Sequence, residues 1–124
     1  MSSLHKLLQR IDESPESIAF DEVIAVISEH YDYTPSGFHN GIGDDAIWNA
    51  AGENAGSCRI FSFAQLHHLD EDSTLACFGH FYREEVLKFP VRDDHRNIRR
   101  FMRDGWPGIR FTSTPLTIKK GNKE

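Results

Sequence analysis

The sequence has few cysteines and no long apolar run. Two cysteines, Cys58 and Cys77, occur in 124 residues, and their spacing is not typical of a disulfide scaffold, so we expect two free thiols. No segment approaches the roughly 18 uninterrupted apolar residues that a membrane-spanning helix requires. The first eleven residues lack the apolar stretch and cleavage site of a secretory signal peptide. The sequence therefore predicts no membrane span and no export by the general secretory route.

Fingerprints of cofactor and metal sites are also lacking. The chain has no glycine-rich phosphate-binding motif and no EF-hand spacing, and it shows no internal repeat or low-complexity tract. A metal site could use His67, His68, Cys77 and His80, but only Cys77 and His80 have a spacing that places both on one helix face. We expect no cofactor and no metal.

The charges are present in both signs but are unevenly divided. Residues 1–82 hold 13 acidic and 3 basic residues, whereas residues 83–124 hold 6 acidic and 11 basic residues. Such asymmetry can indicate an acidic partner, but two halves of one small domain can also neutralise each other. Because the net charge is −5, we expect no nucleic-acid partner and no membrane partner.

Apolar residues at helical spacing predict four helices in residues 1–90. The first follows a Ser2 or Ser3 cap and ends near Ser14. The second begins at Phe20 and ends near Tyr31. A third begins at Ser57 as its N-cap and continues to Leu66, although a strand over residues 59–63 is an alternative. The fourth starts near Asp70 and places Leu75, Phe78, Tyr82 and Val86 on one face before Pro90.

The rest of the chain predicts one more helix and two strands. Asp93 or Asp94 caps the helix, Ile98, Phe101 and Met102 face inward, and Gly105 ends it. Alternation at 109–111 and 116–118 predicts a C-terminal β-hairpin, and residues 119–124 should fray. The fold class is therefore α+β: one mostly helical domain of about five helices with a short hairpin, and one further short strand near Phe38.

Two regions are predicted to bind a partner. Residues 34–56 are rich in turn-forming groups, and a connection this long is often functional; its candidate residues are Asn40, Asp44, Asp45, Glu53 and Asn54. The second region is the arginine face of the last helix, formed by Arg96, Arg99, Arg100 and Arg103, which could bind carboxylates or instead pair with the acidic part of the chain. Trp106 could anchor a partner or pack at the junction between helix and strand.

Cys58 is the one candidate nucleophile. A cysteine at a helix N-terminus is activated by the helix dipole, and His67, His68, His80, His95 and Asn54 could supply a base and an orienting group. The histidine of papain-type proteases lies too far downstream for a chain with only 66 residues after Cys58. A buried structural cysteine is the favoured interpretation.

Several strings resemble the HopJ type III effector family. They are Tyr-Asp-Tyr-Thr-Pro at 31–35, Phe-His-Asn-Gly at 38–41, Asn-Ala-Gly-Ser-Cys-Arg-Ile-Phe at 54–61 and Leu-Ala-Cys-Phe-Gly at 75–79. A fifth contains His95, Asn97, Ile98, Arg99, Phe101 and Met102 and ends in Gly-Trp-Pro-Gly-Ile-Arg-Phe at 105–111. The resemblance spans nearly the whole domain. It implies an effector or virulence role but no reaction and no catalytic residues.

The leading hypothesis is therefore a non-enzymatic interaction protein made in the bacterial cytoplasm and secreted by a type III system into a host cell. One alternative is a small cysteine-dependent hydrolase or transferase that uses Cys58. The other is a bacterial housekeeping domain.

Overall fold

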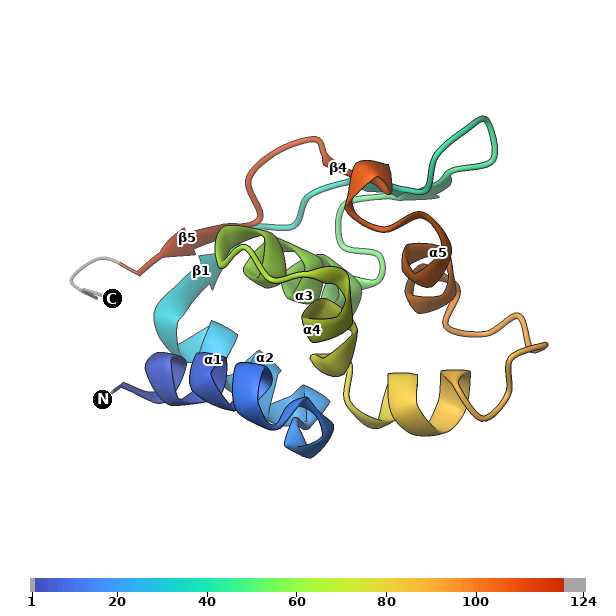
Figure 1. Cartoon of the computed structure of the whole chain (residues 1–124). Helices are drawn as coiled ribbons and strands as arrows, with labels where there is room; N and C mark the ends of the chain where they lie inside the picture. Colours follow the sequence, from blue (N-terminus) through green and yellow to red (C-terminus); the bar gives the residue numbers. More distant parts are fainter. Residues whose placement is uncertain (1, 120–124) are drawn as a thin grey trace.

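The computed structural model describes residues 2–119 and confirms the α+β fold class (Figure 1). The α-helices are α1 (Ser3–Glu13), α2 (Phe20–His30), α3 (Ala55–Leu66), α4 (Glu71–Ala76) and α5 (Arg96–Asp104). Short 3₁₀-helices form at η1 (Pro15–Ser17) and η3 (Trp106–Gly108), and η2 (Phe81–Val86) is a π-helix. The strands are β1 (Tyr31–Tyr33), β2 (Phe38–Asn40), β3 (Ile47–Asn49), β4 (Ile109–Phe111) and β5 (Leu116–Ile118).

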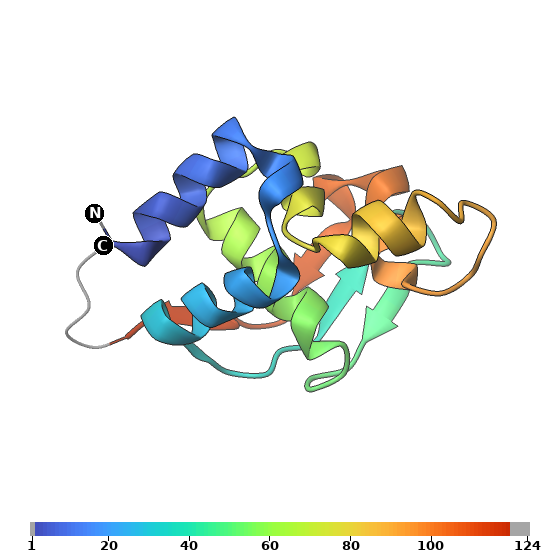
Figure 2. The same cartoon turned by 90° about the horizontal axis from the view of Figure 1, so that it is seen from below.

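The first two helices form where the apolar spacing predicts them. The Ser2 hydroxyl caps α1 by accepting from the His5 N–H at 3.1 Å, and the apolar stripe Leu4, Leu7 and Ile11 is buried. Glu22 accepts the Ala19 N–H at 2.8 Å and so closes the first turn of α2. The two helices contact each other and cover one side of the molecule (Figure 2).

The C-terminal strands exist, but the predicted β-hairpin between them is wrong. β4 pairs antiparallel with β2, which also pairs with β3, whereas β5 pairs antiparallel with β1. Segments 31–40 and 109–118 thus run antiparallel and side by side. The two pairings share the same register, because Tyr31 faces Ile118 in one and Phe38 faces Phe111 in the other. Pro35 and Pro115 interrupt the ladder because proline has no N–H to donate.

Helix boundaries in the middle of the chain differ from the predictions. α3 starts at Ala55 and not after Ser57, with Asn54 in the left-handed region at φ 50°. The predicted fourth helix is broken: α4 ends at Ala76, Gly79 has a φ of 59°, and η2 follows. Only glycine adopts this conformation easily, and an added Cβ would lie 2.6 Å from the Phe20 nitrogen.

α5 also departs from its predicted cap and face. His95, at φ 49°, is the N-cap, and neither Asp93 nor Asp94 caps the helix; the Asp94 carboxylate instead accepts from Arg99 at 2.7 Å. Met102 is 45% exposed, so its predicted inward position is wrong. At the C-terminal end, Lys119 donates its N–H to the His30 carbonyl at 3.0 Å, and residues 120–124 of the predicted frayed tail lie outside the described residues.

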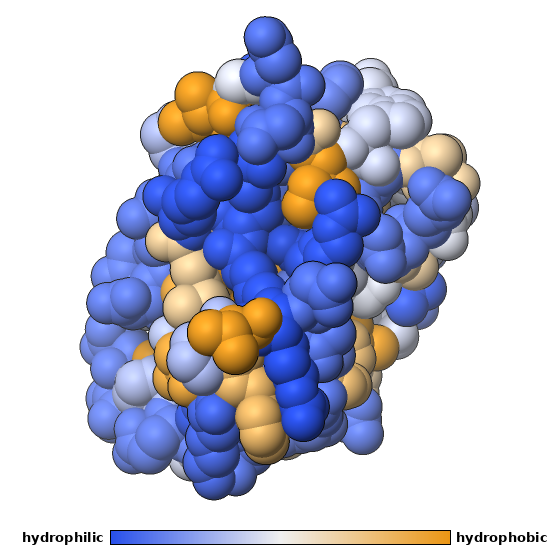
Figure 3. Space-filling view, turned by 90° about the vertical axis from the view of Figure 1, so that its right-hand side faces the viewer, coloured by the Kyte–Doolittle hydropathy of each residue, from blue (hydrophilic) through white to orange (hydrophobic). Residues whose placement is uncertain are grey.

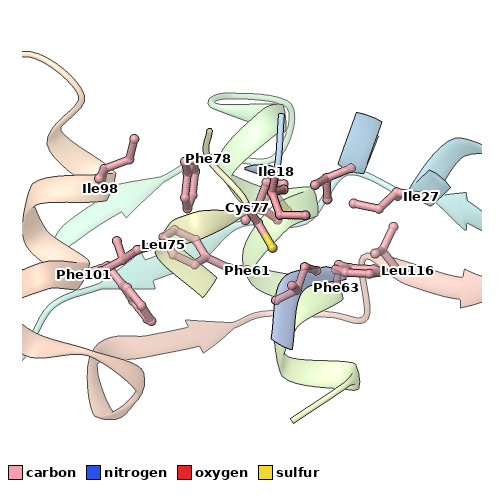
Figure 4. Packing of buried hydrophobic residues seen from close by; sticks show 14 of the residues in the cluster. Ile18, Ile27, Phe61, Phe63, Leu75, Cys77, Phe78, Ile98, Phe101 and Leu116 are labelled. Carbon is pink, nitrogen blue, oxygen red and sulfur yellow. The ribbon is translucent and has the colours of Figure 1, made fainter. Parts of the chain in front are cut away.

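The core is built around α3, which passes through the centre of the molecule (Figures 1 and 4). Ile60, Phe61 and Phe63 are fully buried, and residues 59–63 are helical, so the strand alternative is wrong. The Phe61 ring lies 5.4 Å from Phe78 and 5.0 Å from Phe101, centroid to centroid. α3 is thereby held between α4 and α5, and its N-terminus comes close to that of α5.

Candidate functional site

One cavity lies where the N-termini of α3 and α5 meet. It has a volume of about 540 Å³, and its walls also include η2. Its polar and charged lining residues are Asn54, Ser57, Asp93, Asp94, His95, Arg96 and Asn97, and its apolar ones include Phe20, Ile47, Phe78, Phe81 and Ile98. A cavity of this size that combines apolar walls with polar groups can serve as a ligand site.

A second cavity of about 310 Å³ continues along the outer face of α5. It is lined by Ile47, Asp93 and all four residues of the arginine face. Ile47, Asp93 and Arg96 line both cavities, so we treat the two as one groove, here named the α5 groove. Figure 3 shows this side of the molecule, where hydrophilic side chains separate small apolar patches.

Two left-handed residues shape the end of the groove. Asn54 and His95 are the N-caps of α3 and α5, and neither makes a side-chain cap hydrogen bond. Non-glycine residues in this conformation are uncommon and cluster at functional sites. His95 is held in place by Glu85, whose carboxylate lies 2.8 Å from the imidazole Nε2, and its ring lies tilted against that of Phe81, with the centroids 5.4 Å apart.

The arginine face is largely neutralised from within the molecule. Arg100 bonds to Asp104 at 2.7 Å and to Asp45 at 2.8 Å. The Ile42 N–H and the Arg100 guanidinium both bond to Asp104 and lower its pKa to about 2; the hydrogen bond from Arg100 likewise lowers the pKa of Asp45. Asp45 thus fixes the β2–β3 turn to α5.

The other arginines differ in their pairing. Arg99 bonds to Asp94 at 2.7 Å, and Arg103 bonds to Asp104 at 3.0 Å. Arg96 is exposed and has no ion-pair partner among residues 2–119. Of the four predicted arginines, Arg96 is therefore the one whose charge is left for a ligand.

Three buried asparagines, Asn40, Asn49 and Asn97, form a polar network beside the groove, and the exposed Asn54 joins it. Asn40 donates to the side chain of Asn97 at 3.0 Å, Asn97 donates to Asn49 at 2.9 Å, and Asn54 donates to Asn49 at 2.6 Å. Asn40 is fully buried, so it supports the site and does not contact a partner. Asn49 and Asn97 were not among the predicted site residues. The alternation of the strands could have indicated Asn49, because Asn40 and Asn49 share the inward face of their strands with Phe38 and Ile47.

The remaining predicted binding residues are not gathered in one place. Glu53 accepts the Ala50 N–H at 3.0 Å and stabilises the turn before α3, and Asp44 is exposed at the β2–β3 turn. The Trp106 indole N–H donates to the Leu69 carbonyl at 2.9 Å, and its ring packs on Phe101. Trp106 therefore has a packing role at the junction between helix and strand.

Cys58 lacks the surroundings of a nucleophile. Its side chain is 1% exposed, its thiol points to the Ser36 carbonyl at 3.7 Å, and burial raises its pKa. His67 lies elsewhere, with its Nε2 2.6 Å from the Tyr31 hydroxyl. A thiolate nucleophile needs access and an adjacent base, and the structure places neither at Cys58.

The candidate metal ligands are likewise separated. Cys77 is fully buried in the core, and burial raises its pKa to about 12, whereas the His80 side chain is 57% exposed and lies beside Glu85. Within residues 2–119, no three histidine, cysteine or acidic residues are placed to hold a metal ion.

Fold and site together define a small α+β domain with buried thiols and an open polar groove. The chain belongs to the HopJ type III effector protein family, whose model matches residues 4–116. It is similar to the crystal structure of "unknown function protein VPA0580", with 50% identity and a TM-score of 0.90 over 96% of this chain and 95% of that chain. No curated protein matches the chain. Among the described residues, no helix has the length and apolar character needed to cross a membrane.

Proposed function

We propose that the protein is an effector-type interaction protein that works by binding a protein partner in the α5 groove, without catalysis. The observation that carries this proposal is the continuity of the two cavities through Arg96, the one member of the arginine face that lacks an ion pair among the described residues. Arginine is enriched among the residues that dominate binding energy at protein interfaces. The partner therefore carries a group that complements this cation.

The surroundings of Arg96 support binding more than chemistry. The groove contains apolar walls, amide groups and two helix N-termini, which together can recognise a polar chain segment. The competing cysteine-dependent reaction would need Cys58, whose side chain is buried near the start of α3. Binding through the groove requires no movement of the core.

The site of action follows from the family. We propose that the protein is made in the bacterial cytoplasm and delivered by a type III system to a host cell, where it contributes to virulence. If the protein instead has a housekeeping role inside the bacterium, we expect no export. A reporter fused to the chain should enter host cells from a wild-type strain and should remain in bacteria whose type III apparatus is inactivated; retention in both strains would support the housekeeping role.

Site-specific photo-crosslinking tests the binding surface. A photoreactive residue replaces Asp93, which lines both cavities, and in a control chain replaces Asp12, which is exposed on α1. We expect one discrete adduct with host extract from position 93, absent from position 12 and lost in the Arg96→Glu variant. The captured protein is then purified, and its Kd for the wild-type chain should be at least about tenfold lower than for Arg96→Glu. Equal affinity for both chains would overturn the proposal.

A further inference from the structure

We propose that the larger cavity of the α5 groove binds the C-terminal carboxylate of a polypeptide whose last side chain is apolar. This inference rests on the proposed function, because it names the group of the partner that enters the groove.

Arg96 supplies the positive charge. It lines both cavities, and unlike Arg99, Arg100 and Arg103 it has no carboxylate partner within residues 2–119. A guanidinium can form two parallel hydrogen bonds to one carboxylate. Binding a carboxylate would therefore give Arg96 the partner that its neighbours already have.

Backbone N–H groups in the same cavity also favour a bound carboxylate. Gly56, Ser57, Asn97 and Ile98 belong to the first turns of α3 and α5 and line the cavity, and first-turn N–H groups have no acceptor within their own helix. A carboxylate between the two helix ends could accept from these N–H groups and from the Ser57 hydroxyl, while the positive ends of both dipoles favour its charge.

Aromatic walls set the size of the last side chain. Phe20 and Phe81 meet edge to face at 5.2 Å and form one wall with Phe78. Ile47 and Ile98 belong to the same lining. A volume of about 540 Å³ exceeds what a lone carboxylate needs and accommodates an apolar side chain beside it.

Two aspartates restrict the kind of anion. Asp94 is paired with Arg99, but Asp93 is exposed and has no partner among the described residues. A phosphate group carries nearly two negative charges and would be repelled more strongly by these carboxylates than a carboxylate with one. A polypeptide end also presents backbone N–H groups, from which the Asp93 carboxylate can accept a hydrogen bond. A small organic acid has no such groups. Both observations favour a chain end over a phosphate or a small organic acid.

Paired peptides test the inference directly. N-acetyl-triglycyl-phenylalanine is titrated into the full chain as the free acid and as the C-terminal amide, with binding followed by ¹⁵N–¹H NMR. We expect the free acid to shift the backbone signals of Ser57 and Asn97 and to bind at least about tenfold more tightly than the amide, because a charge-assisted hydrogen bond is lost with the amide. Arg96→Gln should weaken the free acid by a similar factor. Arg110→Gln, a change of an exposed arginine on β4 that lines neither of these cavities, should leave it unchanged.

Other probes distinguish the source of the anion. Phenylpropionate and phenyl phosphate share the ring but lack a peptide backbone, so we expect each to bind at least about tenfold more weakly than the peptide acid. Equal binding of phenylpropionate, tighter binding of phenyl phosphate, equal binding of the peptide amide, or shifts confined to other parts of the molecule would each overturn the inference. The proposed function fails separately, if the chain with the photoreactive residue at position 93 forms no adduct. If that adduct forms while the peptide acid does not bind, only the inference about the chain end is wrong.

Discussion

Asn40 on β2 donates from its side-chain nitrogen to both the backbone and the side-chain oxygen of Asn97 on α5, at 2.9 and 3.0 Å. The two residues are 57 positions apart and are both buried. Their pairing fixes the N-terminal turn of α5 to the sheet and so holds one wall of the α5 groove in place.

Replacing Asn97 by alanine should therefore destabilise the whole domain. The change removes the side-chain oxygen that accepts from the buried amides of Asn40 and Asn49, each of which keeps only a backbone acceptor. We expect a loss of about 2 to 4 kcal/mol in the free energy of unfolding, measured by urea denaturation. The double variant with Asn40→Ala should lose less than the two single losses combined, since both changes remove the same hydrogen bond between the Asn40 and Asn97 side chains. Additive losses would contradict this coupling.

The Asp104 ion pair predicts a loss of stability in acid. Its pKa in the folded chain is about 2, below the ordinary value of 3.8, so the unfolded chain takes up this proton first as the pH falls. The stability that Asp104 contributes is thus present above about pH 4 and is lost between about pH 4 and pH 2.

Urea unfolding at several pH values from 2 to 7 measures this loss. Asp104→Asn should flatten part of the decline below pH 4 and lower the stability at pH 7. Asp12→Asn, a change on the exposed side of α1, serves as the matched control and should leave the decline as it is. A decline of the same size in the Asp104 variant would show that other carboxylates cause it.

Gly79 should tolerate no side chain. At a φ of 59°, an added Cβ would meet the Phe20 nitrogen at 2.6 Å and the carbonyl carbon of Ala19 at 3.3 Å. Because both atoms belong to the backbone, they cannot move as a side chain could. We expect Gly79→Ala to cost about 3 kcal/mol or more, from strain and steric overlap together. Gly52→Ala also has a positive φ but meets nothing within 4 Å, so it should cost only about 1 kcal/mol. Equal losses of stability in the two variants would show that steric overlap at Gly79 does not contribute.

Both cysteines should resist alkylation in the native protein. Burial raises the pKa of Cys58, and it raises that of Cys77 to about 12, so at pH 8 neither thiol is appreciably ionised, and neither is accessible. Mass spectrometry after iodoacetamide treatment should show slow modification of both, with a steep increase across the urea unfolding transition. Fast alkylation of Cys58 alone at neutral pH would revive the cysteine-dependent enzyme.

The sequence predicted the parts of the fold that depend on local spacing. The apolar stripes of α1 and α2 and the helix start near Asp70 depend on neighbouring residues, and each forms as expected. Alternation at Ile109 and Leu116 also located two strands. It could not show their partners, because a strand's neighbour is chosen by residues far along the chain, here β2 for β4 and β1 for β5.

The site was harder to predict for the same reason. Asn54 and the four arginines were recognised as candidates, and the structure brings Asn54 and Arg96 to one cavity. The buried role of Asn40 and the contribution of Asn97 arise only when β2 and α5 meet. A single glycine in an apolar pattern, such as Gly79, does not reveal whether the helix continues or breaks.

The contacts of His30 have a practical consequence for building hybrid proteins. Its imidazole lies 2.9 Å from the hydroxyl of Ser3, and its carbonyl accepts the N–H of Lys119, so the first and last described segments meet at one residue. Figure 1 shows them at the opposite side of the molecule from α5. A cargo attached through either segment would emerge on the same side and leave the α5 groove uncovered.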